Sequence, residues 1–254
     1  MLNGLISNIV IFNDDLSNNC TLTLGETLNH LIVVGNNGSG KTSILKLIAD
    51  KLLSDYSTIN SNSNLIEIAY IGDQPCVPSI FINKFIHTEK LISIISDKIN
   101  QVTDVPIIVV VDAIDAYLDL EMQKKILPKL TDRFPRAQLI ISTYSPFVVT
   151  SKENAVVYNL TNKKILNKPN LHSYQSVIEN FFDLGTYSIA TTSIYNRYRQ
   201  LFQKELTIGL TDKERDEISY VSNVLSNTPI SSSELYFSFI EMEGKRMPYT
   251  CHEK

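Results

Sequence analysis

The sequence lacks the features of a secreted or membrane-spanning protein. Its 254 residues include only three cysteines, Cys20, Cys76 and Cys251, which lie far apart. An odd, scattered set argues against a disulfide framework or a cysteine-based zinc site and is compatible with a reducing cytoplasm. No signal peptide is legible at the N-terminus, and no apolar stretch reaches the length of a membrane span. We therefore expect a cytoplasmic protein without a membrane partner.

The sequence also lacks a surplus of basic residues. Its formal net charge is −4, so no strongly basic field is present to attract nucleic acid, and such a contact would need a local patch. One candidate patch interleaves basic residues with tyrosines and comprises Arg197, Arg199, Lys204, Tyr195 and Tyr198. The same spacing fits a solvated helix face beside a buried stripe, which the overall acidity favours. The net charge thus gives no indication of nucleic-acid binding, although this patch keeps nucleic acid as a possible partner.

A glycine-rich loop carries the clearest chemical pattern. It reads G-x-x-x-x-G-K-T from Gly35 to Thr42, with an apolar, β-branched run before it and a helical pattern after it. That strand–loop–helix context distinguishes a phosphate-binding loop from an ordinary Gly-rich turn. Its backbone N–H groups would cradle an anion at a helix N-terminus, Lys41 would reach the outer phosphates, and the Thr42 hydroxyl would ligate Mg²⁺. The expected nucleotide-binding residues of the loop are Asn36, Asn37, Gly38, Ser39, Gly40, Lys41, Thr42 and Ser43.

A second candidate site is the carboxylate of Asp112. It ends the continuous apolar run 106–111, which has the pattern of a fully buried parallel strand. In nucleotide-binding sheets such a carboxylate lies beside the phosphate loop and holds Mg²⁺, directly or through water. An Asp after a strand is also a common helix cap or turn former. Because the loop is present as well, we expect Asp112 to be a magnesium ligand together with Thr42.

The order of elements predicts an α/β fold with a mostly parallel sheet. Strands are expected at residues 5–12, 20–24, 31–34, 65–71, 106–112, 138–143 and 155–160. Helices are expected after the loop to about residue 56, and at 81–100, 120–134, 173–182, 191–206, from 211 to 225, and at 233–242. We therefore expect a nucleotide-binding domain at residues 1–162 and a helical extension at residues 163–254, packed on that domain or on a partner.

Four motifs together resemble one family of nucleotide-binding proteins. They are the loop at 35–43, the stretch Val-Val-Val-Asp-Ala-Ile-Asp-Ala-Tyr-Leu-Asp at 109–119, Ile-Leu-Pro-Lys-Leu at 126–130, and Phe-Pro-Arg-Ala-Gln-Leu-Ile-Ile-Ser-Thr-Tyr-Ser-Pro-Phe-Val at 134–148. Their order is similar to that of ABC-type ATPases, in particular the AAA-like bacterial ATPases of antiphage defence, such as the Septu and retron-associated ATPases. The heads of SMC-like and overcoming-lysogenisation proteins share it. The resemblance covers roughly residues 1–160 and implies a P-loop NTPase with an ABC-type head, and ATP and Mg²⁺ as cofactors.

The sequence departs from that family at its catalytic positions. The family usually has an Asp-Glu pair whose Glu is the general base, but here Ala113 follows Asp112. Alanine has no proton acceptor, and a positioned base contributes about a hundredfold to ten-thousandfold to the rate. The family's switch His is replaced by Tyr144. Asp115 is a possible substitute base, although we expect it to point along the following loop. The resemblance therefore implies a degenerate site.

Two further family elements are uncertain or missing. Gln74 resembles the family's glutamine loop, which senses Mg²⁺ and the γ-phosphate, but it is equally a polar turn residue before Pro75. No Leu-Ser-Gly-Gly type signature is legible between Gln74 and Asp112, so the helical lobe is expected to be severely shortened. In the family that signature completes the partner's ATP site. Its absence puts a symmetric two-ATP dimer in doubt.

These observations leave three functional hypotheses. The first is an ATP-binding subunit of a bacterial assembly, with weak or no hydrolysis, that acts as a nucleotide-gated scaffold or regulator of an effector. Its protein partner would be a second copy, an effector such as a nuclease, or both. The second is an active Mg²⁺-dependent ATPase with a substitute base. The third is a non-catalytic adaptor that has lost nucleotide altogether, against which the intact Lys41 and Thr42 argue.

Overall fold

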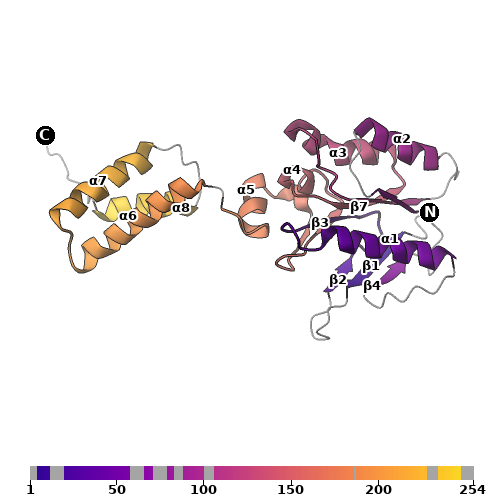
Figure 1. Ribbon diagram of the computed structural model, residues 1–254, viewed down its shortest axis with the longest axis horizontal. Coiled ribbons are helices and arrows are strands. Elements are labelled where there is room, and N and C mark those ends of the chain that lie inside the picture. Colours follow the sequence, from indigo (N-terminus) through magenta and orange to yellow (C-terminus); the bar gives the residue numbers. More distant parts are fainter. Residues whose placement is uncertain are drawn as a thin grey trace. The chain divides into compact units, whose positions relative to one another are not determined.

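The computed structural model divides the chain into two compact units, Met1–Leu184 and Gly185–Lys254 (Figure 1). It describes residues 5–11, 20–57, 66–70, 79–82, 88–99, 106–185, 187–227 and 234–246. In that part of the chain, no helix combines the length and the apolar character needed to cross a membrane.

The first unit is built around a six-stranded, mostly parallel sheet. Its strands are β5 (Ser79–Ile82), β6 (Ile107–Val111), β7 (Ala137–Ser142), β3 (His30–Val34), β8 (Ala155–Asn159) and β9 (Ile165–Asn167), in that spatial order. The first five run parallel and β9 pairs antiparallel with β8. Strands β3, β6, β7 and β8 are buried along their whole length, which explains their near-continuous apolar sequences.

Helices cover both faces of this sheet. Alternate residues of β6 divide between the faces: Ile107 and Val109 pack with α2 (Thr88–Ile99) and α3 (Leu120–Arg133), whereas Ile108 and Val110 pack with α1 (Lys41–Ser57). Figure 1 shows α2 and α3 on the opposite side of the sheet from α1. The α1 helix therefore has one fixed face, and its N-terminus is held at the carboxyl end of β3.

A second, antiparallel sheet packs in the same core as α1. Strand β1 (Ile6–Ile11) pairs with both β2 (Cys20–Thr23) and β4 (Ile66–Tyr70). The buried amide of Gln138 in β7 accepts a hydrogen bond from the Ile6 backbone N–H (2.8 Å) and donates one to the Ile6 carbonyl (2.9 Å). This pair of bonds fixes β1 against the central sheet.

The segment at 81–100 differs from the sequence expectation of a single helix. Residues Ser79–Ile82 form β5, in which Phe81 and Ile82 pair with Val110 and Val111 of β6. The expectation was wrong for residues 81 and 82, because pairing with a buried parallel strand outweighs local helical spacing. In the part of the segment between β5 and β6 that the structure describes, α2 is the only helix.

The chain after β8 stays with the first unit further than expected. After β9 come η1 (Pro169–Leu171), α5 (Tyr174–Ser176) and the π-helical turn η2 (Val177–Phe181), where a single helix at 173–182 was expected. Val177 and Phe181 are buried in the core that contains α2 and α3. The unit boundary therefore falls after Leu184 rather than after residue 162.

The second unit is helical, as its apolar spacing predicts. It comprises α6 (Ile189–Thr207), α7 (Asp212–Asn227) and α8 (Glu234–Arg246), with a core formed chiefly by Tyr198, Leu201, Phe202, Ile218 and Phe239. Two basic residues of the candidate nucleic-acid patch are ion-paired, Arg197 with Glu217 and Lys204 with Glu214, and Tyr198 is fully buried.

Candidate functional site

The glycine-rich loop lies between the carboxyl end of β3 and the first turn of α1. Gly35, Gly38 and Gly40 have φ angles of +146°, +78° and +94°, which side chains rarely allow. A Cβ atom on Gly35 would lie 2.6 Å from Ser39 Oγ and 3.1 Å from Thr161 Oγ1. The loop therefore closes so tightly on itself that its first position accepts only glycine.

Three features of the loop favour an anion as its ligand. The Asn36 N–H donates to Thr161 Oγ1 at 2.8 Å, which ties the loop to the turn after β8. The first turn of α1 contains no acidic residue, so the positive end of the helix dipole is uncompensated. Ser39 Oγ is buried and has no hydrogen-bond partner among the described residues. Such a site, with donors at a helix N-terminus, favours phosphate.

Lys41 is buried and folded back over the loop. Its ammonium donates to the Gly35 carbonyl at 2.7 Å and to the Asn36 carbonyl at 3.0 Å, and it lies 3.8 Å from the ring centroid of Tyr144. These contacts hold the cation at the place where the outer phosphates of a bound nucleotide are expected.

Asp112 lies beside Thr42, as the motif spacing predicts. The Thr42 hydroxyl donates to Asp112 Oδ2 at 2.7 Å, and the Ser142 hydroxyl donates to Asp112 Oδ1 at 2.5 Å. Asp112 follows β6 and Ser142 ends β7, so the sheet brings these side chains together at one edge. A hydroxyl and a carboxylate are oxygen ligands of the kind that Mg²⁺ prefers.

A magnesium ion at this place would need further ligands. No group of three or more His, Cys, Asp and Glu side chains that could hold a metal occurs within the described ranges. Thr42 and Asp112 therefore fit an ion whose coordination is completed by phosphate oxygens and water, as is usual for Mg²⁺ with nucleotides. Gln74, the third expected ligand, lies outside the residues that the structure describes.

The segment after β7 positions Tyr144 rigidly. The Thr143 N–H donates to the Val33 carbonyl at 3.1 Å, in the neighbouring strand β3. Ser145 then caps the short helix α4 (Pro146–Val149), with its Oγ accepting the Phe147 and Val148 N–H groups and donating to Gln123 Oε1. Tyr144 is thus fixed on both sides, and its ring is about half exposed (48%).

Ala113 and Asp115 follow Asp112, in the stretch where the sequence resemblance predicts a general base. The Ala113 N–H donates to Ser142 Oγ at 2.7 Å, and its methyl group offers no proton acceptor. We expected Asp115 to point along the following loop. This expectation was wrong, because the carboxylate turns to the backbone of Tyr144. Its Oδ2 accepts the Tyr144 N–H at 3.2 Å, and its buried Oδ1 has no hydrogen-bond partner in the described part of the chain.

Ser142 and Thr161 are site residues that sequence reasoning missed. Ser142 joins Asp112 to the Ala113 backbone, and Thr161 accepts the Asn36 N–H. The available signal for Ser142 was a hydroxyl at the carboxyl end of an otherwise apolar strand. No signal in the sequence brings Thr161 to the loop, because that contact depends on the pairing of β3 with β8.

His30, at the start of β3, is a structural rather than a site residue. Its Nδ1 accepts the Leu139 N–H of β7 at 3.1 Å, and its side chain is almost fully buried. Burial lowers the pKa of His30 to about 4, with a smaller contribution from the positive charge of Lys152. The imidazole is therefore neutral at pH 7 and links β3 to β7.

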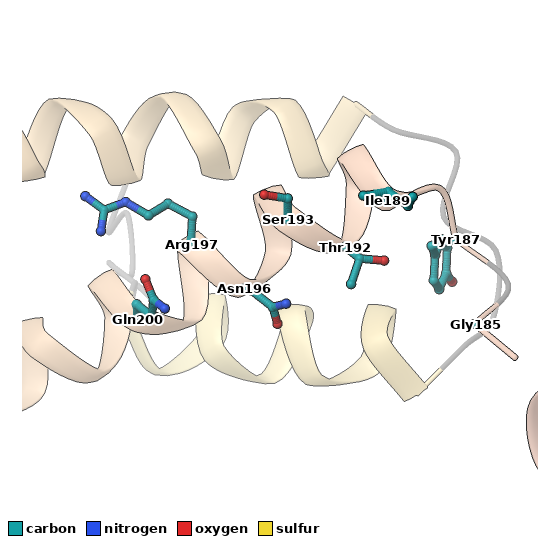
Figure 2. Close-up of a pocket in the computed structure, with 8 residues that line it drawn as sticks. All are labelled: Gly185, Tyr187, Ile189, Thr192, Ser193, Asn196, Arg197 and Gln200. Atoms are coloured by element: carbon teal, nitrogen blue, oxygen red, sulfur yellow. The ribbon is translucent and has the colours of Figure 1, made fainter. Parts of the chain in front are cut away.

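Two hollows are lined by residues other than those of the phosphate loop. One, of about 830 Å³, is bordered by residues of α2 and α3 that include Ile92, Met122 and Arg133. The other, of about 660 Å³, lies along α6, and Figure 2 shows the polar side chains Thr192, Ser193, Asn196, Arg197 and Gln200 that line it. Neither is lined by residues of the phosphate loop.

The fold and this constellation are those of a P-loop NTPase domain. A parallel sheet, a glycine loop that opens a helix, and a lysine, a threonine and a strand-end aspartate at one edge are its defining parts. The predicted fold class is confirmed: an α/β P-loop NTPase domain with a mostly parallel central sheet, followed by a helical C-terminal part.

Comparison with known proteins agrees with this class. The model of the ATPase family associated with various cellular activities (AAA) matches residues 31–154, slightly less than half of the chain. The first unit therefore carries an ATP-binding domain that is similar to AAA ATPases. No curated protein sequence matches the chain.

Among solved structures, the chain is similar to cbiO1 from Clostridium perfringens, described as part of the ABC transporter complex cbiONQ. The likeness covers 79% of this chain and 95% of that one, at 10% identity and a TM-score of 0.37. It is too distant to add to the assignment.

Proposed function

We propose that this protein is a nucleotide-gated subunit of a bacterial multiprotein assembly that binds ATP with Mg²⁺ and hydrolyses it weakly or not at all. The observation that carries the proposal is the combination of an intact binding half and an altered catalytic half. The Thr42–Asp112 hydrogen bond and the Lys41 contacts support the binding of magnesium and phosphate beside the loop. Ala113, beside Asp112, has no atom that can accept a proton from water.

The binding half is argued from what each residue would do. The N–H groups of the loop would hold the phosphates, and Lys41 would neutralise their charge. Thr42 and Asp112 would hold Mg²⁺, which supplies charge neutralisation between the phosphates when bound. Asn37, Gly38, Thr42 and Ser43 are exposed, so a nucleotide can reach them.

One observation favours the alternative of an active ATPase. Asp115 Oδ1 is a buried carboxylate oxygen without a hydrogen-bond partner in the described residues, and its side chain reaches the backbone of Tyr144. A carboxylate near the γ-phosphate site is a candidate base. We place this second, because Oδ2 already accepts the Tyr144 N–H and the side chain thereby acts as a fixed structural acceptor.

The proposed partner is a protein. The second unit exposes large apolar side chains, among them Ile189 (91%), Ile208 (84%) and Phe237 (65%), that its own core does not cover. Exposed apolar surface of this kind is common where proteins associate. A second copy, an effector such as a nuclease, or both would fit. A cytoplasmic role in antiphage defence rests on the resemblance of the sequence motifs, which is an argument from family rather than from the site.

A paired assay of binding and turnover tests the proposal. Saturating Mg-ATP should raise the melting temperature, because a ligand that binds only the folded state stabilises it by mass action. Lys41→Ala should remove that shift. Turnover by the unmodified chain should be at, or only slightly above, the background level shown by Lys41→Ala, and Ala113→Glu tests whether a base alone raises it. Vigorous hydrolysis that Lys41→Ala abolishes and Asp115→Asn reduces would favour the alternative ATPase; no binding at all would favour an adaptor.

Assembly is tested separately by light scattering. The chain alone, and with the products of neighbouring genes, is measured with and without Mg-ATP. We expect a complex whose stability changes with nucleotide. A strict monomer under all of these conditions would contradict the scaffold proposal while leaving nucleotide binding intact.

A further inference from the structure

The Lys41 ammonium is fully engaged by protein groups before any nucleotide arrives. An ammonium has three N–H donors. Two of them reach the carbonyls of Gly35 and Asn36, at 2.7 and 3.0 Å, and the aromatic face of Tyr144 lies 3.8 Å away. Lys41 is only 6% exposed, so water cannot easily replace these contacts. A phosphate that binds Lys41 must therefore displace some of them.

The ring of Tyr144 is the contact that phosphate is best placed to displace. The two carbonyls belong to the loop itself and stay beside Lys41 when phosphate binds. The ring, in contrast, covers the ammonium from the neighbouring segment after β7, and it is about half exposed (48%). The side chains of Tyr144, Phe182 and Leu184 border a hollow of about 50 Å³ next to Gly35. This space gives the ring a direction in which to turn.

The backbone of Tyr144 is fixed, so that the ring approaches Lys41 reproducibly. Its N–H donates to Asp115 Oδ2 at 3.2 Å, Thr143 is bound to β3, and Ser145 caps α4. The fixed backbone directs the Cα–Cβ bond of Tyr144, so only the side-chain torsions have to be ordered when the ring contacts Lys41.

We propose that Tyr144 is an autoinhibitory cover on the phosphate loop, which competes with the nucleotide phosphates for the Lys41 ammonium. This inference rests on the proposed nucleotide-binding function and concerns the regulation of the same site. Tyr144 acts through Lys41, so it is a positioning residue. In the nucleotide-free protein its aromatic face stabilises the charge of Lys41 in place of phosphate. Binding of a di- or triphosphate expels the ring, so the segment between β7 and α4 reports whether the loop is filled.

The expected effect follows from the strength of a cation–π contact. At a largely desolvated site such a contact corresponds to roughly five- to thirtyfold in an equilibrium constant. Tyr144→Leu keeps an apolar side chain but removes the aromatic face. It should therefore bind Mg-ATP about five- to thirtyfold more tightly than the unmodified protein. Tyr144→Phe keeps the aromatic ring and should bind Mg-ATP about as weakly as the unmodified protein does.

Calorimetric titration of the full chain with Mg-ATP measures these affinities. Tyr220→Leu, at an exposed tyrosine of α7, makes the same chemical change away from the loop and should leave the affinity unchanged. Lys41→Ala should bind no nucleotide. Thermal unfolding of each variant confirms that the fold is retained, as expected for a half-exposed side chain.

A spectroscopic readout separates displacement from a general change in stability. The chain contains no tryptophan, so Tyr144→Trp introduces a single indole at this position. Indole is the strongest aromatic partner of an ammonium. Its emission should change on addition of Mg-ATP, with the same midpoint as the calorimetric titration.

The outcomes distinguish the inference from the proposed function. Tighter binding by Tyr144→Leu, weak binding by Tyr144→Phe and a titrating indole signal together support the cover. Equal affinities in all Tyr144 variants, weaker binding by Tyr144→Leu, or an indole that stays silent while calorimetry detects binding would overturn it and leave ATP binding standing. No binding by any variant, Tyr144→Leu included, would overturn the proposed function and the cover with it.

Discussion

Replacing Ser142 by alanine should destabilise the central sheet at the site. The Ser142 hydroxyl makes one buried and one partly buried hydrogen bond, donating to Asp112 Oδ1 at 2.5 Å and accepting the Ala113 N–H at 2.7 Å. Ser142 is 1% exposed and Asp112 is 8% exposed, so water cannot readily take the place of the hydroxyl. The variant leaves a carboxylate oxygen and an amide N–H without this partner.

The magnitude follows from the cost of unsatisfied polar groups. A buried donor or acceptor that loses its partner costs about 1–3 kcal/mol, and more for a charged group. With two groups affected, we expect Ser142→Ala to lower the free energy of unfolding by roughly 2–4 kcal/mol. Ser151→Ala is the matched control, because Ser151 Oγ makes a single local hydrogen bond to the Val148 carbonyl and is partly exposed. It should cost less than about 1 kcal/mol.

Hydrogen exchange read by mass spectrometry is the appropriate assay. The chain has two units, so one global unfolding transition would mix their stabilities. Exchange of amides in peptides that cover β6 and β7 gives the opening free energy of this part of the sheet alone. If Ser142→Ala protects these amides as well as Ser151→Ala does, the hydroxyl does not hold Asp112 and Ala113 as the structure indicates.

Two further changes probe the loop and the sheet beneath it. Gly35→Ala should cost at least about 1–3 kcal/mol of stability and weaken ATP binding, because the φ of +146° and a Cβ 2.6 Å from Ser39 Oγ force the loop to shift; unchanged calorimetric affinity would contradict this. Between pH 6.5 and about 4, His30 is protonated in the unfolded chain but neutral in the folded chain. The free energy of unfolding should therefore fall by roughly 3 kcal/mol as the pH drops through this range. His30→Asn keeps an acceptor for the Leu139 N–H and should lose this component; urea titrations with the same pH slope in both proteins would refute it.

The sequence was sufficient for the parts of the site that are local. The loop at Gly35–Thr42 carries its structure in its own glycines, and the β-branched run before Asp112 defines a buried strand with a carboxylate at its end. Their meeting follows from a general rule, because the carboxyl ends of parallel strands lie at one edge of a sheet. The hydrogen bond from Thr42 to Asp112 Oδ2 is the outcome of that rule.

The sequence was insufficient where a contact depends on strand order. The helical spacing at 81–100 concealed β5, because Ile80 and Ile82 are buried by pairing with β6, which no local pattern reveals. Thr161 supports the loop only because β8 lies next to β3. The end of the first unit was placed too early for the same reason, since Phe181 packs on a sheet that is far from it in sequence.

The direction of Asp115 shows how a single backbone angle decides the chemistry of the site. Ala113 has a φ of +51°, in the left-handed region that alanine seldom adopts, and the Ile114 N–H then donates to the Ser142 carbonyl at 3.0 Å. This turn sends the Asp115 carboxylate back to the Tyr144 backbone instead of along the following loop. The residues at the positions where the sequence resemblance predicts a general base and a switch histidine are connected to each other. Asp115 follows the turn at Ala113 and accepts the Tyr144 N–H, and the Tyr144 ring lies over Lys41. Independent loss of catalytic groups would not require such a chain of contacts, which is why we favour a site adapted to control nucleotide binding over one that has merely decayed.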